Sequence, residues 1–175
     1  MQPVDDKNKC LIILGSAPCL MDDLDAMPWI CLYDYMAIGL DAVDRYPAGL
    51  KYVATFHPAE ITDIRKRREV YGGNTDYKVI SHEPQNTDIV IEDWWKPSGS
   101  SALLGVQAAI RLGYDRIILC GCPLQGKDRH GGDYHTMFSK GWNDRIKEIK
   151  DHVRSMSGWT RELLGVPTEE WIILT

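Results

Sequence analysis

Two short apolar runs interrupt the otherwise mixed hydrophobic pattern of this chain. They are Cys10–Leu14 and Arg116–Cys120, in which only Arg116 is polar. Short runs without polar alternation are typical of strands that are buried on both faces of a parallel sheet. Each run opens into a loop of small residues, so the pattern predicts two central strands with functional loops at their carboxyl ends.

The rest of the pattern alternates between strand-like and helix-like segments. Further strands are predicted at residues 29–33, 51–56, 77–81, 89–91 and 151–156. Helical spacing of apolar residues predicts helices at 20–26, 35–46, 59–71, 101–112, 138–149 and 159–164. Alternating strands and helices favour an α/β fold with a parallel sheet. We therefore expect one Rossmann-like domain over residues 1–175, with an open, mostly parallel sheet and helices on both faces, in three layers.

Composition limits the partners of this domain. The chain has 175 residues, 44% of them hydrophobic and 26% charged, which suits a single soluble core. A net charge of -5 argues against a broad nucleic-acid-binding face. No apolar run approaches the roughly 20 residues that cross a bilayer. We expect a small-molecule ligand, no nucleic-acid partner and no membrane span, and the sequence is compatible with an oligomer.

The cysteines indicate a reducing compartment. The chain has five, an odd number, and no CxxC pair. Most lie in or beside apolar runs, where a reduced cysteine acts as a small hydrophobic residue. Residues 1–9 are polar and carry acids, unlike a signal peptide. We therefore expect a cytoplasmic protein.

The loop after the first strand is the first candidate ligand site. Gly15, Ser16, Ala17 and Pro18 lie between that strand and a predicted helix, where backbone groups face a phosphate or sugar near a helix N-terminus. The loop has one glycine, and Pro18 has no N–H, so it is not the GxGxxG dinucleotide motif. A plain strand-to-helix turn is the alternative interpretation.

Asp34 is a candidate contact to a ribose or base. It follows Gly15 by 19 positions, at the end of the strand predicted at 29–33. Nucleotide-binding βαβ units place an acid at about that distance, against a ribose hydroxyl. The alternative is that Asp34 is the N-cap of the following helix.

A hydroxyl-rich turn precedes the helix predicted at 101–112. Ser98, Gly99, Ser100 and Ser101 come immediately before its first apolar residues. The first N–H groups of a helix have no partner within it, and the helix dipole favours an anion there. Gly121 opens the loop after the other central strand, and ligands bind at such strand ends in open α/β sheets.

Three histidines are candidate catalytic residues. His57 follows a predicted strand, while His130 and His135 lie in a polar, glycine-containing segment that also holds Asp133. Flexible polar loops at strand ends often carry catalysis. For His57, a structural hydrogen bond to a neighbouring loop is the alternative. Since His130, Asp133 and His135 do not have the spacing of a fixed metal-ligand motif, we predict no metal site.

Three motifs in this order resemble a known group of proteins. They are the first loop, Gly15-Ser16-Ala17-Pro18-Cys19-Leu20, the Ser98-Gly99-Ser100-Ser101 helix start, and Leu119-Cys120-Gly121-Cys122-Pro123-Leu124. The chain resembles the Rossmann-type proteins that include bacterial sialyltransferases of glycosyltransferase family 42 and the 6-hydroxymethylpterin diphosphokinase-like domain, formerly domain of unknown function 115. Small phage and prophage proteins look similar too, including in the segment 153–158.

The resemblance implies a parallel sheet that binds a nucleotide, with the first loop near phosphate or ribose and the Ser/Gly turn holding the nucleotide. Cys19 stands where a serine is usual, which removes one hydroxyl, and Asp34 stands where the group often has asparagine. The sialyltransferases also use a histidine as general base and tyrosines on the phosphate. His135 or His130, together with Tyr134, are the candidates for these roles in this chain, where no motif aligns them with the family's residues.

These observations lead to one main functional hypothesis and two alternatives. The main hypothesis is a nucleotide-dependent transferase with a CMP-sugar-like donor as substrate and no resident cofactor. One alternative is a phage-type module that binds a nucleotide or a host protein without catalysis. The other is diphosphate transfer to a pterin, with ATP and with Mg²⁺ held by acids such as Asp34 or Asp133.

Overall fold

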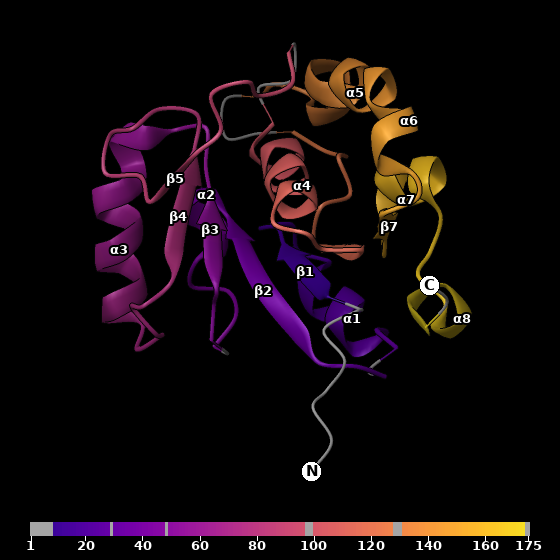
Figure 1. Cartoon of the computed structure of the whole chain (residues 1–175), viewed down its shortest axis with the longest axis horizontal. Helices are drawn as coiled ribbons and strands as arrows, with labels where there is room; N and C mark the ends of the chain where they lie inside the picture. Colours follow the sequence, from indigo (N-terminus) through magenta and orange to yellow (C-terminus); the bar gives the residue numbers. More distant parts are fainter. Residues whose placement is uncertain (1–8, 29, 48, 97–99, 128–130, 174–175) are drawn as a thin grey trace.

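A single sheet of seven strands forms the centre of the molecule (Figure 1). The computed structural model describes residues 9–28, 30–47, 49–96, 100–127 and 131–173. All strand pairs among these residues are parallel, in the order β5-β4-β3-β2-β1-β6-β7. The strands are β1 (Cys10–Leu14), β2 (Tyr33–Ile38), β3 (Tyr52–Ala54), β4 (Lys78–Ser81), β5 (Ile89–Val90), β6 (Arg116–Cys120) and β7 (Val153–Ser155).

The strand order reverses at β1. From β1 to β5 the chain adds each strand to the same side of the sheet, and α4 (Ser101–Arg111) then carries it back to the other side of β1. Leu14, at the end of β1, is therefore level with Ala37 of β2 and with Cys120 of β6. Adjacent strands that lead away in opposite directions form a topological switch point, where open α/β sheets bind ligands.

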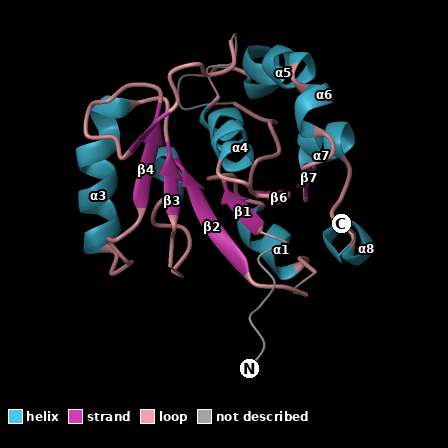
Figure 2. Cartoon of the chain, viewed as in Figure 1, coloured by secondary structure: helices cyan, strands magenta, loops and turns pink. Residues whose placement is uncertain are grey.

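Helices cover both faces of the sheet (Figure 2). Side chains of α1 (Leu20–Asp25), α2 (Gly39–Ala42), α3 (Ile61–Val70) and α8 (Glu169–Ile173) pack into a core cluster with Ile12 and Leu14 of β1. The opposite cluster contains Leu11 and Ile13, together with side chains of α4, α5 (Tyr134–Asp144), α6 (Ile146–Ile149) and α7 (Gly158–Leu164). A short 3₁₀ helix, η1 (Pro58–Glu60), follows β3. The Rossmann-like α/β fold predicted from the sequence is confirmed.

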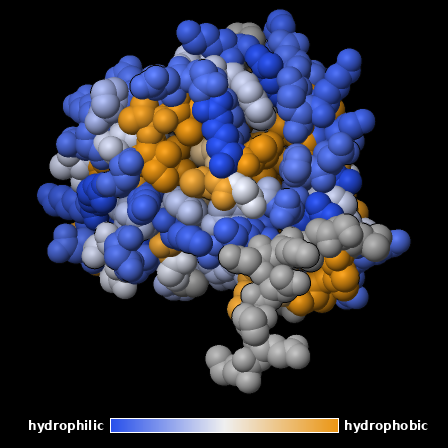
Figure 3. Space-filling view, in the orientation of Figure 1, coloured by the Kyte–Doolittle hydropathy of each residue, from blue (hydrophilic) through white to orange (hydrophobic). Residues whose placement is uncertain are grey.

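The face that carries α4 has a mixed surface. In Figure 1, α4 lies across the side of the sheet that faces the viewer, and Figure 3 shows a hydrophilic strip there with apolar surface on both sides.

The two longest helices of the described structure, α4 and α5, have 11 residues each. In the part of the chain that the structure describes, no helix has the length and apolar character needed to cross a membrane.

Most predicted elements are present, with two substantial differences. β2 runs over Tyr33–Ile38 rather than 29–33, and the helix predicted at 35–46 is reduced to α2. The cause lies in the sequence Tyr33-Asp34-Tyr35, whose side chains are all only partly buried, so the strand does not begin as a continuous apolar run. The helix predicted at 138–149 begins earlier, and Arg145 separates it into α5 and α6.

Candidate functional site

The loops after β1 and β6 meet at the switch point. The Gly15 N–H donates to the Cys120 carbonyl over 2.8 Å, and the Ala17 N–H donates to the Gly121 carbonyl over 3.2 Å. Because all strands are parallel, their carboxyl ends share one edge of the sheet, as the arrowheads in Figure 1 show. We call this the carboxyl edge. The structure thus brings the predicted first loop and Gly121 together there.

Close backbone packing explains the glycines in these two loops. A Cβ atom on Gly15 would lie 2.0 Å from the Gly121 carbonyl oxygen and 2.7 Å from the Cys122 sulfur. Gly121 itself has a φ of +66°, which L side chains rarely adopt. Internal hydrogen bonds also occupy the N–H groups of Gly15 and Ala17, whereas the Ser16 N–H has no partner in the described part of the chain. The first loop therefore offers a ligand fewer amides than its position in the sequence predicts.

A buried carboxylate joins the loops after β1, β6 and β7. Asp23 of α1 is 6% exposed, and its Oδ2 accepts hydrogen bonds from the Gly121 N–H (2.7 Å) and the Ser157 hydroxyl (2.8 Å). The Cys19 sulfur lies 3.3 Å from the same hydroxyl. We did not single out Asp23 from the sequence, where its only signal is an acidic residue in the first turn of the helix after the loop. Its bonds fix the position of the three loops.

The start of α4 is the second part of the carboxyl edge. Ser100 is the N-cap of α4, and its hydroxyl accepts a hydrogen bond from the Leu103 N–H over 3.4 Å. The Ser101 hydroxyl accepts one from the Phe56 N–H over 3.0 Å, which joins this turn to the loop after β3. The N–H groups of Ser101 and Ala102 have no partner within the helix. Ser98 and Gly99 lie outside the described residues.

His57 lies beside this helix start. It follows Phe56 in the loop after β3, its side chain is exposed, and its backbone N–H donates to the Thr55 hydroxyl over 2.9 Å. The imidazole is therefore accessible to a ligand, and its backbone is held in place. Of the three regions that the sequence assigns to one site, the loops at Gly15 and His57 and the start of α4 all lie at the carboxyl edge.

A second histidine, His82, occupies the same edge and was missed in the sequence. It follows β4, and its ring lies 5.0 Å from the Phe56 ring and 5.8 Å from the Trp94 ring, measured between centroids. Its Nδ1 is buried without a hydrogen-bond partner among the described residues, and its Nε2 lies 3.4 Å from the Glu83 carboxylate. The signal available in the sequence was its position directly after a predicted strand.

His135 lies on α5, beside α7. Its ring is exposed and meets the Trp159 ring edge to face at 4.9 Å. Asp133 caps α5, because its carboxylate accepts a hydrogen bond from the Thr136 N–H over 2.8 Å, and this bond lowers the pKa of Asp133. Among the described residues, no three His, Cys, Asp or Glu side chains gather as metal ligands. His130 lies outside the described residues.

Asp34 is not at the carboxyl edge. The predicted strand end at Asp34 is wrong, because Asp34 is the second residue of β2 and is level with Leu11 near the start of β1. Its carboxylate accepts hydrogen bonds from the Tyr114 hydroxyl and, over 2.6 Å, from the Lys51 ammonium. Burial and this carboxylate raise the pKa of Tyr114. These two partners allow the sheet to hold an acid inside β2.

Two cavities in the described structure are lined by residues outside the β1 loop, the β6 loop and the start of α4. One, of about 350 Å³, lies at the amino ends of β6 and β7. The other, of about 420 Å³, lies between α3 and the loop before β5. The chemistry of the carboxyl edge is therefore that of loops and a helix start, and it is not defined by either cavity.

Comparison with known proteins gives one informative result. No protein-family model matches the chain, and no curated protein matches its sequence. Among solved structures, the chain is similar to an α-2,3-sialyltransferase from Campylobacter jejuni in its apo form, with a TM-score of 0.58 and 13% sequence identity. The similarity covers 95% of this chain and 83% of that one. At this identity the likeness shows the fold, which agrees with the sialyltransferase part of the resemblance seen in the sequence.

Proposed function

We propose that this protein is a transferase that uses a nucleotide-activated sugar, such as a CMP-sugar, as its donor. The observation that carries the proposal is the convergence of the β1 loop, the β3 loop and the start of α4 at the carboxyl edge, beside the topological switch point. This is where open α/β sheets bind nucleotides. The solved structure with a similar fold is named as a sialyltransferase, which favours a sugar nucleotide over other nucleotide ligands.

The start of α4 is the main anchor for the donor phosphate in this proposal. An 11-residue helix has unpaired N–H groups and a positive dipole end at its N-terminus. Its first residues, Ser101 and Ala102, would donate these N–H groups to the phosphate. The first loop contributes less, because hydrogen bonds to β6 and its loop already occupy the N–H groups of Gly15 and Ala17.

The proposed reaction is displacement at the anomeric carbon of the donor. The hydroxyl oxygen of an acceptor forms the new glycosidic bond, and the bond to the nucleotide phosphate breaks with its electron pair on the nucleotide. A general base takes the proton of the acceptor hydroxyl. His57 and His135 are exposed and lie on elements at this edge, so both remain candidates, as does His130. The N–H groups at the start of α4 stabilise the charge that develops on the leaving phosphate.

A nucleotide-binding module without catalysis is the second candidate function. The observation that favours it is Cys19, which stands where the similar group has a serine and whose sulfur is engaged by the Ser157 hydroxyl at 3.3 Å. A hydroxyl expected to face a ligand is therefore replaced by a thiol that faces the protein.

Ligand-induced stabilisation tests both candidates. CMP, CDP, UDP, ATP, GTP and their sugar conjugates are added with and without Mg²⁺, and the melting temperature is measured. A ligand at 100 times its dissociation constant stabilises the native state by about 2.7 kcal/mol. For a chain of this size that corresponds to a rise of roughly 5–10 °C. Stabilisation by cytidine nucleotides above the others supports the CMP-sugar donor, and the absence of any nucleotide effect contradicts both candidates.

Donor hydrolysis and transfer then separate enzyme from binder. We expect His57→Ala or His135→Ala to abolish turnover while nucleotide stabilisation is unchanged, and each variant is a control for the other because both side chains are exposed. His82→Ala tests the histidine that the sequence did not indicate. Nucleotide binding without turnover of any donor would support the binding module instead.

A further inference from the structure

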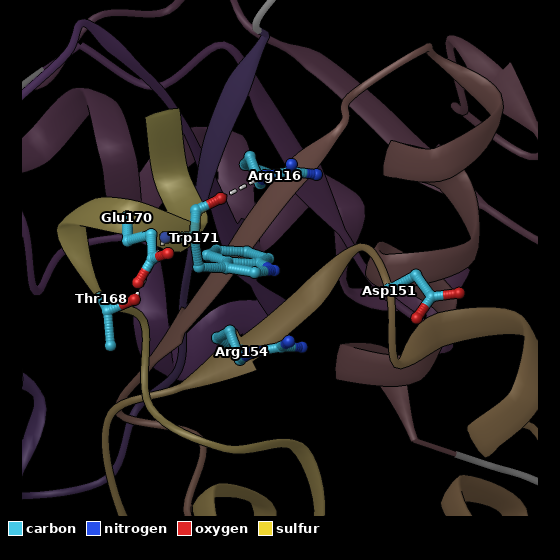
Figure 4. A pocket seen from close by; sticks show the side chains of 6 residues that line it. All are labelled: Arg116, Asp151, Arg154, Thr168, Glu170 and Trp171. Atoms are coloured by element: carbon cyan, nitrogen blue, oxygen red, sulfur yellow. Dashed lines mark hydrogen bonds between the residues drawn. The ribbon is translucent and has the colours of Figure 1, made fainter. Parts of the chain in front are cut away.

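The cavity of about 350 Å³ lies at the edge of the sheet opposite the carboxyl edge. Arg116 begins β6, Asp151 precedes β7, and Arg154 is the middle residue of β7, so the amino ends of these two strands form its floor. Residues near or in α8 complete the lining (Figure 4). The full set of lining residues is Arg116, Asp151, Arg154, Thr168, Glu170 and Trp171.

Two guanidinium groups enclose the Trp171 indole. The Cζ of Arg154 lies 4.8 Å from the ring centroid and the Cζ of Arg116 lies 5.0 Å from it. In Figure 4 the two arginines lie on opposite faces of the ring, and all three side chains point toward the side of the cavity where Asp151 lies. The guanidinium groups and the edge of the indole thus face one space.

Protein contacts fix the orientation of these side chains and leave hydrogen-bond donors for a ligand. Arg116 Nε donates to the Trp171 carbonyl over 2.6 Å, and Arg154 Nη1 donates to the Val153 carbonyl over 2.8 Å. Arg154 Nη1 also donates to the Lys150 carbonyl. Among the described residues, Arg154 Nε, Arg154 Nη2 and the Trp171 indole N–H have no partner. The acceptors of these arginine hydrogen bonds are uncharged main-chain carbonyls, so none of them neutralises the positive charge of Arg154.

The charge in the cavity is positive at its wall and negative at its rim. Asp151 and Glu170 are exposed, whereas both arginines are partly buried. Within the described ranges, no carboxylate forms an ion pair with Arg154. Burial lowers the pKa of Arg154, the Asp151 carboxylate offsets part of this effect, and the positive charge of Arg116 lowers the pKa again. A bound anion would relieve this repulsion, and solvent would screen the exposed carboxylates more than the arginines.

We propose that this cavity binds a small phosphate monoester that carries hydroxyl groups. The phosphate oxygens accept hydrogen bonds from the Arg154 fork and the Trp171 N–H, since guanidinium groups suit the planar, bidentate recognition of phosphate. The hydroxyl groups of the ligand donate to Asp151, which lies on the side of the cavity toward which the guanidinium groups point. A volume of about 350 Å³ fits a small molecule rather than a polymer. This site lies at the other edge of the sheet and does not depend on the proposed function.

Nuclear magnetic resonance locates the binding in the full chain. Inorganic phosphate, ribose 5-phosphate, and ribose with chloride at matched ionic strength are titrated while ¹H–¹⁵N spectra are recorded. The Trp171 indole signal is assigned by its loss in Trp171→Phe. We expect a saturable shift of that signal with both phosphates, tighter for ribose 5-phosphate, and no shift with ribose and chloride. Shifts confined to the backbone amides at the start of α4 would overturn the proposal.

Calorimetry on variants tests the donors. Arg154→Gln should weaken ribose 5-phosphate binding at least about tenfold, because a charge-assisted bidentate contact is lost. Arg145→Gln is the matched control, since Arg145 is a partly buried arginine stacked 5.7 Å from the Trp95 centroid, outside this cavity. If Arg154→Gln does not fold, Arg154→Lys replaces it in the affinity measurement, because lysine keeps the positive charge but lacks the two-pronged guanidinium group. Unchanged affinity in the folded Arg154 variant overturns the proposal.

Discussion

Replacing Asp23 with alanine should destabilise the protein by about 2–4 kcal/mol. The substitution leaves the buried Gly121 N–H without an acceptor, and an unsatisfied buried donor costs about 1–3 kcal/mol. The Ser157 hydroxyl also loses its acceptor, at a cost of about 1 kcal/mol, because this hydroxyl is only partly buried. Asp23→Asn retains an acceptor oxygen without the charge, so we expect it to lose about 1 kcal/mol.

Urea denaturation followed by circular dichroism measures these losses. With a slope of about 2 kcal/mol per molar urea, Asp23→Ala should lower the midpoint by roughly 1–2 M. Asp22→Ala is the matched control, because Asp22 lies in the same helical turn, is exposed and should lose no more than about 0.5 kcal/mol. Equal midpoints for the two alanine variants would show that Asp23 does not join the loops as described.

Two further predictions test the packing around the switch point. Gly15→Ala should cost about 3 kcal/mol or more in urea denaturation, because its Cβ would meet the Gly121 carbonyl oxygen at 2.0 Å and neither backbone can yield easily. Gly49→Ala, which has no atom within 4 Å of its added Cβ, should not lower stability and should raise it by no more than about 1 kcal/mol. Burial raises the pKa of the Cys120 thiol, so the native protein should resist alkylation of Cys120 at pH 8, and labelling in urea should be fast. The stability due to this shift is fully present below the ordinary thiol pKa of 9.0 and is lost as pH rises above it, so Cys120→Ala should flatten the dependence of the urea midpoint on pH between 8 and 10.

The central strands could be predicted from the sequence to the residue. β1 and β6 have the predicted bounds because both faces of each strand are buried, so all positions except Arg116, the partly buried first residue of β6, are apolar and the runs have clear ends. β2 could not be placed in this way. Its first residues are partly exposed, and Asp34 is accommodated by a tyrosine and a lysine from distant parts of the chain. A pattern based on local hydrophobicity does not contain those partners.

The residues of the candidate site differ in the same way, because local sequence patterns predict some of them and not others. The loop at Gly15 and the turn at Ser100 could be found in the sequence because glycine and hydroxyl residues directly adjoin strong strand and helix patterns. Asp23 could not, since it matters through contacts with Gly121 and Ser157, which are far away in the chain. His82 directly follows a predicted strand, as His57 does, but its contact with the Phe56 ring is not part of a local pattern. From the sequence, the glycine at position 15 is explained by a ligand that approaches the backbone of the loop. In the structure, the close contact of Gly15 with the Gly121 backbone is enough to require a glycine there.

The hydrogen bonds at the switch point constrain where a phosphate can bind. Protein acceptors already take the N–H groups of Gly15, Ala17 and Gly121, which are the amides nearest to the reversal of strand order. An anion that enters this edge therefore gains most at the start of α4, where Ser101 and Ala102 keep their N–H groups. Asp23 has a further effect, because its negative charge lies against the loops after β6 and β7 and disfavours an anion beside Gly121. In the proposed function, the same bonds that hold the three loops together would direct the phosphate of a nucleotide donor toward the start of α4 and leave the loops after β1 and β6 to its uncharged parts.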